Sequence, residues 1–159
     1  MKVIFLDIDG VLNSGKPGPR HNENPTQARH VAQLGRILQA TGAQVVWSTT
    51  WRTTRRQDEL DAFVRARGLA DFKSVGVTPD LTTRPKMSLF LARPRREEVR
   101  AWLDAHPEVT RLVTIDDDTE AEVEPGTHVQ CEDIEGGGLS AERADLAIRI
   151  LGAELERSA

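Results

Sequence analysis

Short apolar runs alternate with amphipathic stretches along this chain. The run at residues 3–6 is continuous, which is typical of a parallel strand buried on both faces, and residues 43–48 and 111–115 also read as buried strands. Two weaker runs, at residues 74–78 and 127–131, fit two further strands. The pattern therefore predicts a five-stranded parallel sheet.

Four stretches between these runs have the apolar period of helices. They are residues 25–41, opened by Asn24 and closed by Gly42; residues 54–67, closed by Gly68; a stretch that starts at Pro94; and one that opens at Ser140 and places Ala144, Ala147, Ile148, Leu151 and Leu155 on one face. Regular alternation of strand and helix predicts an α/β fold, a Rossmann-like three-layer sandwich with helices on both faces of the sheet.

The length and composition agree with one domain over residues 1–159. The longest apolar run is too short to span a bilayer, and the first residues lack the pattern of a signal peptide. Cys131 is the only cysteine, so an internal disulfide is excluded and a packing role is expected. We therefore expect a cytoplasmic protein without membrane attachment.

The net charge of −4 is unevenly distributed. Residues 50–100 contain twelve basic and seven acidic side chains, whereas residues 101–159 contain four basic and fifteen acidic ones. A basic middle segment is compatible with nucleic-acid contact, and it is equally compatible with an ordinary solvated surface. Both interpretations stay open.

Polar side chains follow three of the predicted strands. Asp7 and Asp9 come after the first strand, Ser48 after the second, and Asp116 and Asp117 after the fourth. Residues two apart in an extended chain point to the same side, so Asp7 and Asp9 are expected to face one small volume. Ligands of open α/β sheets bind beyond the carboxyl ends of the strands. The sequence therefore predicts an acidic site at this edge.

Such a cluster of carboxylates indicates metal-assisted phosphoryl transfer. Clustered carboxylates repel one another unless a cation holds them, and oxygen ligands without grouped His or Cys favour Mg²⁺. The four histidines have no ligand spacing, which disfavours zinc. An ionised aspartate can attack phosphorus to form an aspartyl phosphate, and a second carboxylate can transfer the protons.

Three segments resemble sequence motifs of the haloacid dehalogenase-like (HAD) phosphohydrolase superfamily. DIDGVLN (7–13) resembles the first motif, VVWSTTWR (45–52) the second and LVTIDDD (112–118) the fourth. The resemblance implies that Asp7 is the nucleophile. It further implies that Asp9 is the general acid/base and that Ser48 donates a hydrogen bond to the phosphoryl group.

The same resemblance implies the metal ligands and a cation. The Mg²⁺ ligands would be Asp7, the Asp9 backbone carbonyl and Asp117, with Asp116 ligating through water or supporting from behind. Asp118 continues the acidic run, so the assignment of ligands to this run can shift by one residue. The superfamily also places a Lys or Arg at the start of the helix before the fourth motif. That cation is assigned to Arg95, with Lys86 and Arg96 as rivals.

The gaps between the motifs are too short for a large insertion, which implies minimal or no cap and an open site. By the pattern of the superfamily, open sites suit large substrates such as nucleic-acid ends or phosphoproteins. The later segments of the chain also resemble HAD domains of bacterial RNA-repair proteins. More distantly, they resemble the phosphatase half of polynucleotide kinase-phosphatases.

Five residues near the motifs are candidates for substrate binding: Gly10, Thr49, Trp51, Arg52 and Lys86. Trp51 and the arginines that follow it suit base stacking and phosphate contact. Alternatively, Trp51 packs as a lid over the first helical turn.

The leading hypothesis is a Mg²⁺-dependent phosphomonoesterase that acts on a phosphorylated substrate, with polynucleotide 3′-phosphate ends as the favoured class. The enzymatic alternative is a phosphatase for a nucleotide or another small metabolite. The alternative from another class is a non-catalytic module that binds metal and phosphate. The sequence indicates neither an oligomeric state nor a protein partner.

Overall fold

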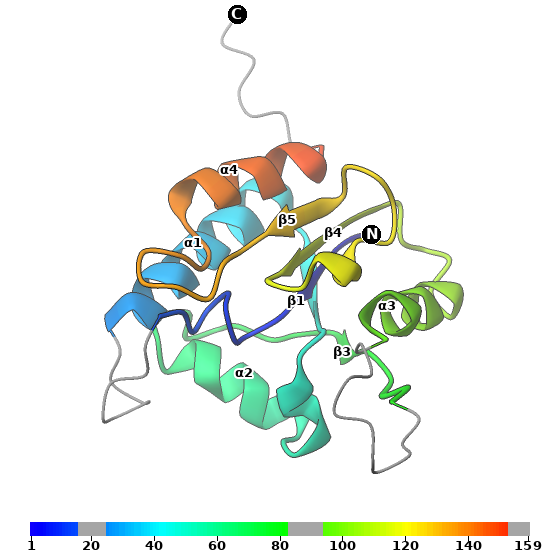
Figure 1. Ribbon diagram of the computed structural model, residues 1–159, viewed down its shortest axis with the longest axis horizontal. Coiled ribbons are helices and arrows are strands. Elements are labelled where there is room, and N and C mark those ends of the chain that lie inside the picture. The colour runs from blue at the N-terminus through cyan, green and yellow to red at the C-terminus, as the bar shows by residue number, and fades with distance from the viewer. Residues whose placement is uncertain (16–24, 83–93, 153–159) are drawn as a thin grey trace, which may run out of the picture.

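The computed structural model describes residues 1–15, 25–82 and 94–152, in which strands and helices alternate (Figure 1). The strands are β1 (Lys2–Leu6), β2 (Gln44–Trp47), β3 (Gly76–Val77), β4 (Arg111–Asp116) and β5 (His128–Gln130). The helices are α1 (Pro25–Thr41), α2 (Gln57–Arg65), α3 (Arg95–Asp104) and α4 (Ala141–Ile150), with 3₁₀ turns η1 (Thr50–Thr53) and η2 (Thr119–Ala121).

The five strands form one parallel sheet in the order β3-β2-β1-β4-β5, which confirms the predicted fold class. The central strand β1 pairs with β2 and β4. Leu6 of β1 lies opposite Trp47 of β2 and Ile115 of β4. The carboxyl ends of these three strands therefore lie at the same level.

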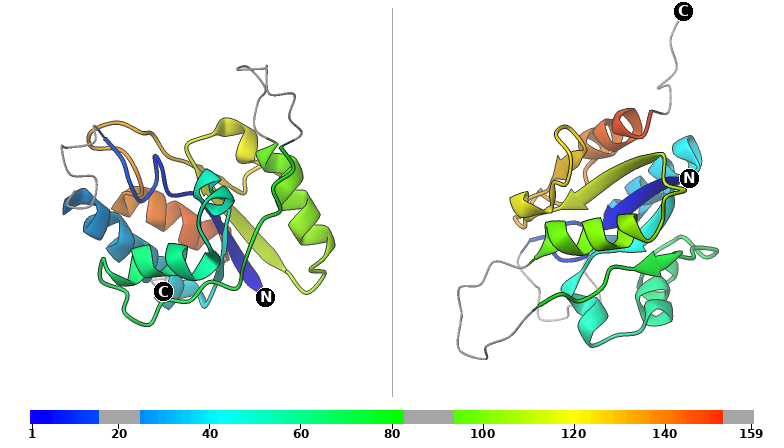
Figure 2. Two further views of the ribbon diagram at one scale, coloured as in Figure 1. Left: turned by 90° about the horizontal axis from the view of Figure 1, so that it is seen from below. Right: turned by 90° about the vertical axis from the view of Figure 1, so that its right-hand side faces the viewer.

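Helices cover both faces of the sheet (Figure 2, left). On one face, apolar side chains of α1, α2 and α4 pack against Ile4 and Leu6 of β1. On the other face, α3 packs against Val3 and Phe5, and the Phe5 ring meets the Trp102 ring edge-on at 5.6 Å. Because consecutive residues of β1 are buried on opposite faces, the strand is apolar without alternation.

Two elements are shorter than predicted. The helix expected at residues 54–67 begins only at Gln57, because Thr49 caps a 3₁₀ turn by accepting the Trp51 N–H (3.3 Å). The strand expected at residues 74–78 is reduced to β3. The order of the elements is unchanged.

Other predicted boundaries are confirmed. Gly42 follows α1 with a φ of +66°, Pro94 precedes α3, and the Ser140 hydroxyl caps α4 by accepting a backbone N–H (3.2 Å). The predicted cap Asn24 and the apolar Leu155 lie outside the described residues.

Within the part of the chain that the structure describes, no cap domain interrupts the sheet and its helices. None of the helices in these ranges is long and apolar enough to cross a membrane. Cys131 is buried against the core, and burial raises the pKa of its thiol to about 12. This placement agrees with the packing role predicted for it.

Candidate active site

Asp7, Ser48 and Asp116 lie side by side where three neighbouring strands end. The Ser48 N–H donates to the Leu6 carbonyl (2.8 Å), and the Asp7 N–H donates to the Ile115 carbonyl (3.1 Å). All three side chains are buried. The structure therefore brings together the polar groups that the sequence placed at separate strand ends, because the strands pair in register.

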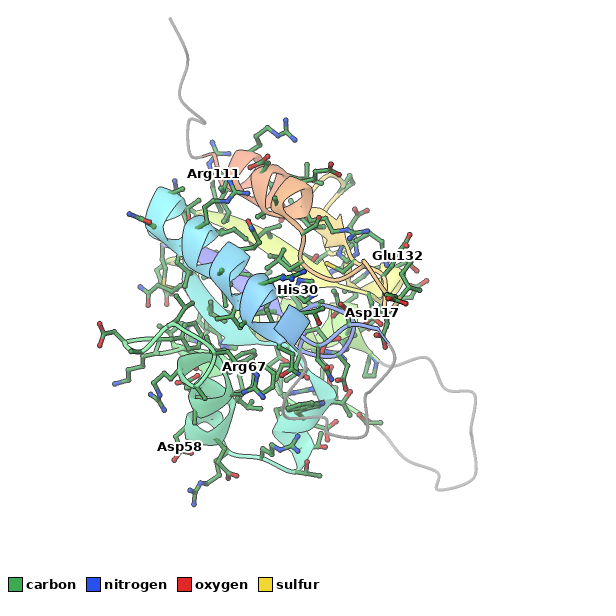
Figure 3. All side chains as sticks on the ribbon, turned by 90° about the vertical axis from the view of Figure 1, so that its left-hand side faces the viewer. His30, Asp58, Arg67, Arg111, Asp117 and Glu132 are labelled. Atoms are coloured by element: carbon green, nitrogen blue, oxygen red, sulfur yellow. The ribbon has the colours of Figure 1, made fainter. Side chains whose placement is uncertain are left out.

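Three carboxylates form a compact cluster at this edge. Oxygens of Asp7, Asp116 and Asp117 all lie within 4.8 Å of one another. Asp117, labelled in Figure 3, lies against the loop that follows β1. A Cβ atom on Gly10, whose φ is +79°, would lie 2.5 Å from Asp117 Oδ2. The position predicted as a substrate contact, Gly10, thus has a steric reason to be glycine.

The register of the acidic run follows from the role of Asp118. Its side chain accepts the Glu120 N–H (2.9 Å) and caps η2, while its own N–H donates to Asp116 Oδ1 (3.0 Å). Asp118 is therefore a capping residue. The cluster takes its two later carboxylates from Asp116 and Asp117.

Burial determines the protonation of this cluster. Removal from water raises the pKa of Asp7, and removal from water together with the nearby Asp7 carboxylate raises the pKa of Asp116. A divalent cation among these oxygens would favour their ionised forms. An all-oxygen donor set of this kind fits Mg²⁺ better than zinc.

Arg95 lies directly beside the carboxylates. Its guanidinium nitrogens are 3.6 Å from Asp7 Oδ2 and 3.7 Å from Asp116 Oδ2, and the side chain is buried. It also donates to the Ser48 carbonyl and to Thr50 Oγ1. Burial lowers the pKa of Arg95, but the carboxylates around it, Asp7 and Asp116 foremost, outweigh that effect and hold the pKa above its ordinary value. A fixed positive charge therefore faces the cluster.

The described rival to Arg95, Arg96, lies against other partners. Arg96 donates to the Glu122 carbonyl (2.6 Å) and pairs with the Glu120 carboxylate (3.5 Å). Lys86 lies outside the described residues. Among the residues that the structure describes, Arg95 is the cation that the fold brings to the predicted third-motif position.

Asp9 reaches the site through a turn. The predicted alignment of Asp7 and Asp9 required an extended chain, but β1 ends at Leu6 and the Ile8 carbonyl accepts the N–H groups of Val11 and two following residues. Asp9 is exposed, whereas Asp7 is buried. Ile8 turns into the core, and this burial bends the chain away from the strand direction.

Two side chains orient the Asp9 carboxylate. The Trp51 indole N–H donates to Oδ2 (2.8 Å), and the Asn13 amide donates to Oδ1 (3.1 Å). Gln27 of α1 in turn donates to Asn13 Oδ1 (2.9 Å). The sequence reasoning missed Asn13 and Gln27, although Asn13 is the last residue of the first motif.

Arg52 has partners inside the protein. Its guanidinium pairs with the Glu98 carboxylate (2.5 Å) and donates to the carbonyls of Thr49 (2.5 Å) and Thr78 (2.9 Å). Both charged side chains are buried. These donors hold the end of β2, and the substrate contact predicted for Arg52 stays a prediction. Thr49, also predicted to bind substrate, is fully buried and caps η1.

Ser48 Oγ is a buried oxygen without a hydrogen-bond partner among the described residues. Leaving a buried hydroxyl unpaired costs about 1–3 kcal/mol, so natural proteins retain such a group mainly where a ligand or an ordered water completes it. An oxygen of a bound phosphoryl group would accept this hydroxyl. The unpaired atom thus supports the predicted phosphate-binding role.

Ser48→Ala is expected to raise the free energy of unfolding by about 1 kcal/mol, because the unpaired hydroxyl is removed, and to weaken the predicted binding of a phosphoryl group. Ser74→Ala is the matched control, since Ser74 is equally buried but its hydroxyl accepts the Gln57 amide (3.0 Å). Urea denaturation without metal measures the free energy of unfolding of both variants. Equal destabilisation by the two changes would contradict the assignment.

Searches of the curated proteins and of the solved structures give no match to this chain. The model of one protein family, described as the HAD domain in Swiss Army Knife RNA repair proteins, matches residues 3–144. The match covers the five strands except Lys2 at the start of β1, and it includes every described carboxylate of the cluster. HAD domains carry out phosphohydrolase chemistry and typically use a divalent metal. The chain therefore belongs to the HAD superfamily, as a HAD domain of the type found in Swiss Army Knife RNA repair proteins.

Proposed function

We propose that this domain is a Mg²⁺-dependent phosphomonoesterase that removes the phosphate from polynucleotide 3′ ends. One observation carries the proposal. A buried arginine, Arg95, faces a compact cluster of carboxylates that includes Asp7, at the edge where α/β sheets bind ligands. Such a site holds an anion next to a carboxylate nucleophile.

In the proposed reaction, an Asp7 carboxylate oxygen attacks phosphorus and the bond from phosphorus to the leaving oxygen breaks. Asp9 donates a proton to that oxygen, so the product leaves as an alcohol. Water then attacks the phosphorus of the aspartyl phosphate and gives its proton to Asp9. The bond between phosphorus and Asp7 breaks, which releases inorganic phosphate and restores both carboxyl groups.

Neighbouring groups stabilise the transferring phosphoryl group. Arg95 offers a fixed positive charge that offsets the approach of two anions, and the Ser48 hydroxyl offers a hydrogen bond. Trp51 and Asn13 keep the Asp9 carboxylate in one orientation. Preorganised donors of this kind need no rearrangement during the reaction.

The oxygens of Asp7, Asp116 and Asp117, together with the Asp9 backbone carbonyl, would hold Mg²⁺. The bound cation supplies charge neutralisation between the carboxylate and the phosphate. The fit rests on the donor set, because oxygens of three carboxylates converge there, and among the described residues no histidine or cysteine belongs to this group.

Membership of a family named for RNA repair supports polynucleotide ends as the substrate class. The absence of a cap domain from the described residues is in line with a large substrate. Residues 50–100 contain twelve basic and seven acidic side chains, a balance that suits contact with a polyanion.

The test is release of phosphate from p-nitrophenyl phosphate, a 3′-phosphorylated oligonucleotide and a nucleoside 3′-monophosphate, with Mg²⁺ or with EDTA. We expect EDTA to abolish release and Asp7→Asn to lower it by about 10³-fold or more. The exposed Asp71→Asn is the matched control and should retain the wild-type rate.

Absence of release from all three substrates, or release undiminished in Asp7→Asn, would overturn the phosphatase. Retention of full activity in EDTA would overturn the metal dependence. Preference for the mononucleotide over the oligonucleotide would favour the small-metabolite alternative and overturn the polynucleotide assignment.

A further inference from the structure

A pocket of about 600 Å³ opens next to the side chains that hold Asp9. Its lining comes from the loop after β1, from α1, and from the segment that runs through η1 and α2. Two of the lining residues, Asn13 and Trp51, also hold the Asp9 carboxylate by hydrogen bonds. The pocket therefore begins one side chain away from the proposed general acid.

One wall of the pocket holds two neighbouring aromatic rings between two guanidinium groups. The Arg55 guanidinium lies 4.1 Å from the centre of the Trp51 ring, and the Trp51 and Phe63 rings meet edge-on at 5.4 Å. The Arg67 guanidinium lies 3.6 Å from the centre of the Phe63 ring. Aromatic rings and planar guanidinium groups are the surfaces on which unstacked nucleobases bind.

Hydrogen bonds fix the inner end of this wall. Arg67, labelled in Figure 3 between α1 and α2, donates to Gln27 Oε1 (2.7 Å) and to the Phe63 carbonyl (2.8 Å). Gln27 is itself bonded to Asn13 (2.9 Å). The wall and the Asp9 carboxylate thus belong to one connected hydrogen-bonded frame, which holds them at a constant separation.

The charge of the pocket favours a base over a second phosphate. Arg55 and Arg67 contribute positive charge, but the carboxylate of Glu59 also lines the pocket and would repel an anion. A neutral aromatic ring avoids this repulsion and can still stack on the rings and guanidinium groups of the wall.

The size of the pocket limits what can enter. A volume of about 600 Å³ is typical of sites for one small organic ligand, and a single nucleoside fits it. A base that stacks on the rings of the wall has left the stack of its own strand, as bases do in sites that recognise single strands.

The proposed reaction places the leaving group next to Asp9, on the side of the site where the pocket opens. Asp9 protonates the leaving oxygen, which in a polynucleotide belongs to the sugar of the terminal nucleotide. We infer that the pocket beside Asp9 binds the base of that unpaired terminal nucleotide, stacked along the wall formed by Arg55, Trp51 and Phe63. This inference rests on the proposed function and names the part of the substrate that the enzyme reads.

The test compares kcat/KM for three substrates: a single-stranded 3′-phosphorylated oligonucleotide, the same oligonucleotide with an abasic terminal nucleotide, and p-nitrophenyl phosphate. The ratio of the first kcat/KM to the third is expected to fall about tenfold in Arg55→Ala, in keeping with the loss of one stacking contact. Arg56→Ala should keep the wild-type ratio, because Arg56 is exposed, pairs with Asp58 and does not line the pocket.

The abasic substrate separates stacking from charge. In the wild type it is expected to react about tenfold less efficiently than the oligonucleotide with its base, and Arg55→Ala should affect it no more than Arg56→Ala does. Equal efficiency with and without the terminal base would overturn the inference. An equal loss on both oligonucleotides in Arg55→Ala would also overturn it, because the arginine would then act through phosphate alone.

Binding measurements distinguish this inference from the proposed function. Fluorescence anisotropy of labelled oligonucleotides is measured with Asp7→Asn, which keeps the pocket residues. Tighter binding of the base-bearing strand, without phosphate release by the wild type, would overturn the phosphatase and support the pocket. Phosphate release by the wild type, with equal binding of both strands, would overturn the pocket alone.

Discussion

Replacing Arg95 with alanine is expected to lower kcat for p-nitrophenyl phosphate by about 10³-fold or more, the size of effect seen when a preorganised cation is removed from phosphoryl transfer. The Arg95 guanidinium lies within 3.7 Å of carboxylate oxygens of both Asp7 and Asp116. Without the guanidinium, the Asp7 and Asp116 carboxylates and the incoming phosphate repel one another, and one of the positive charges that offset this repulsion is lost. Steady-state kinetics in saturating Mg²⁺ measure the change.

Arg96→Ala is the matched control for this experiment. The two arginines are adjacent in the first turn of α3, but Arg96 contacts only Glu122 and Glu120 among the described residues. Arg95→Lys should restore part of the lost rate, because a lysine keeps the charge without the planar pair of donors. Circular dichroism establishes that each variant is folded. A loss below tenfold in Arg95→Ala, or an equal loss in Arg96→Ala, would contradict the assignment.

Glu98→Gln is expected to lower the free energy of unfolding by about 3 kcal/mol, because it leaves the buried charge of Arg52 without its partner. The two side chains pair at 2.5 Å and are almost wholly buried. Burial lowers the pKa of Arg52, and the Glu98 carboxylate opposes that shift. Glutamine keeps the shape of the side chain and removes only its charge.

Glu97→Gln provides the control, since Glu97 is exposed on the same turn of α3 and its replacement should change the free energy of unfolding by less than about 0.5 kcal/mol. Urea denaturation at constant pH measures both variants. Equal free energies of unfolding for Glu97→Gln and Glu98→Gln would show that the buried pair contributes little to stability. A loss confined to Glu98→Gln would establish the pair as the anchor of the site, because Arg52 also holds the carbonyls of Thr49 and Thr78.

The architecture followed from the order of elements in the sequence. A continuous apolar run such as residues 3–6 predicts a strand that is buried on both faces. A parallel sheet with helices on both sides provides this burial. Asp7, Ser48 and Asp116 follow three such runs. Strands that pair in parallel register bring their carboxyl ends together, so the acidic cluster could be predicted without coordinates.

Element boundaries and the path of the first loop were less predictable. The turn at residues 50–53 forms because Thr49 caps it, a contact that competes with an earlier start of α2. The loop after β1 bends because Ile8 enters the core, so strand alternation fails for Asp9. Local patterns do not include such tertiary packing.

By itself, the sequence determined the α/β fold, the carboxylates at the strand ends and the family of the chain. Only the tertiary structure decided which arginine serves which purpose: Arg95 faces the carboxylates, Arg52 is buried against Glu98, and Arg55 lies over Trp51. All three are the same residue type in basic stretches. Their roles differ because a guanidinium acts on whatever the fold places within a few ångströms of it, and that neighbour comes from a distant part of the chain.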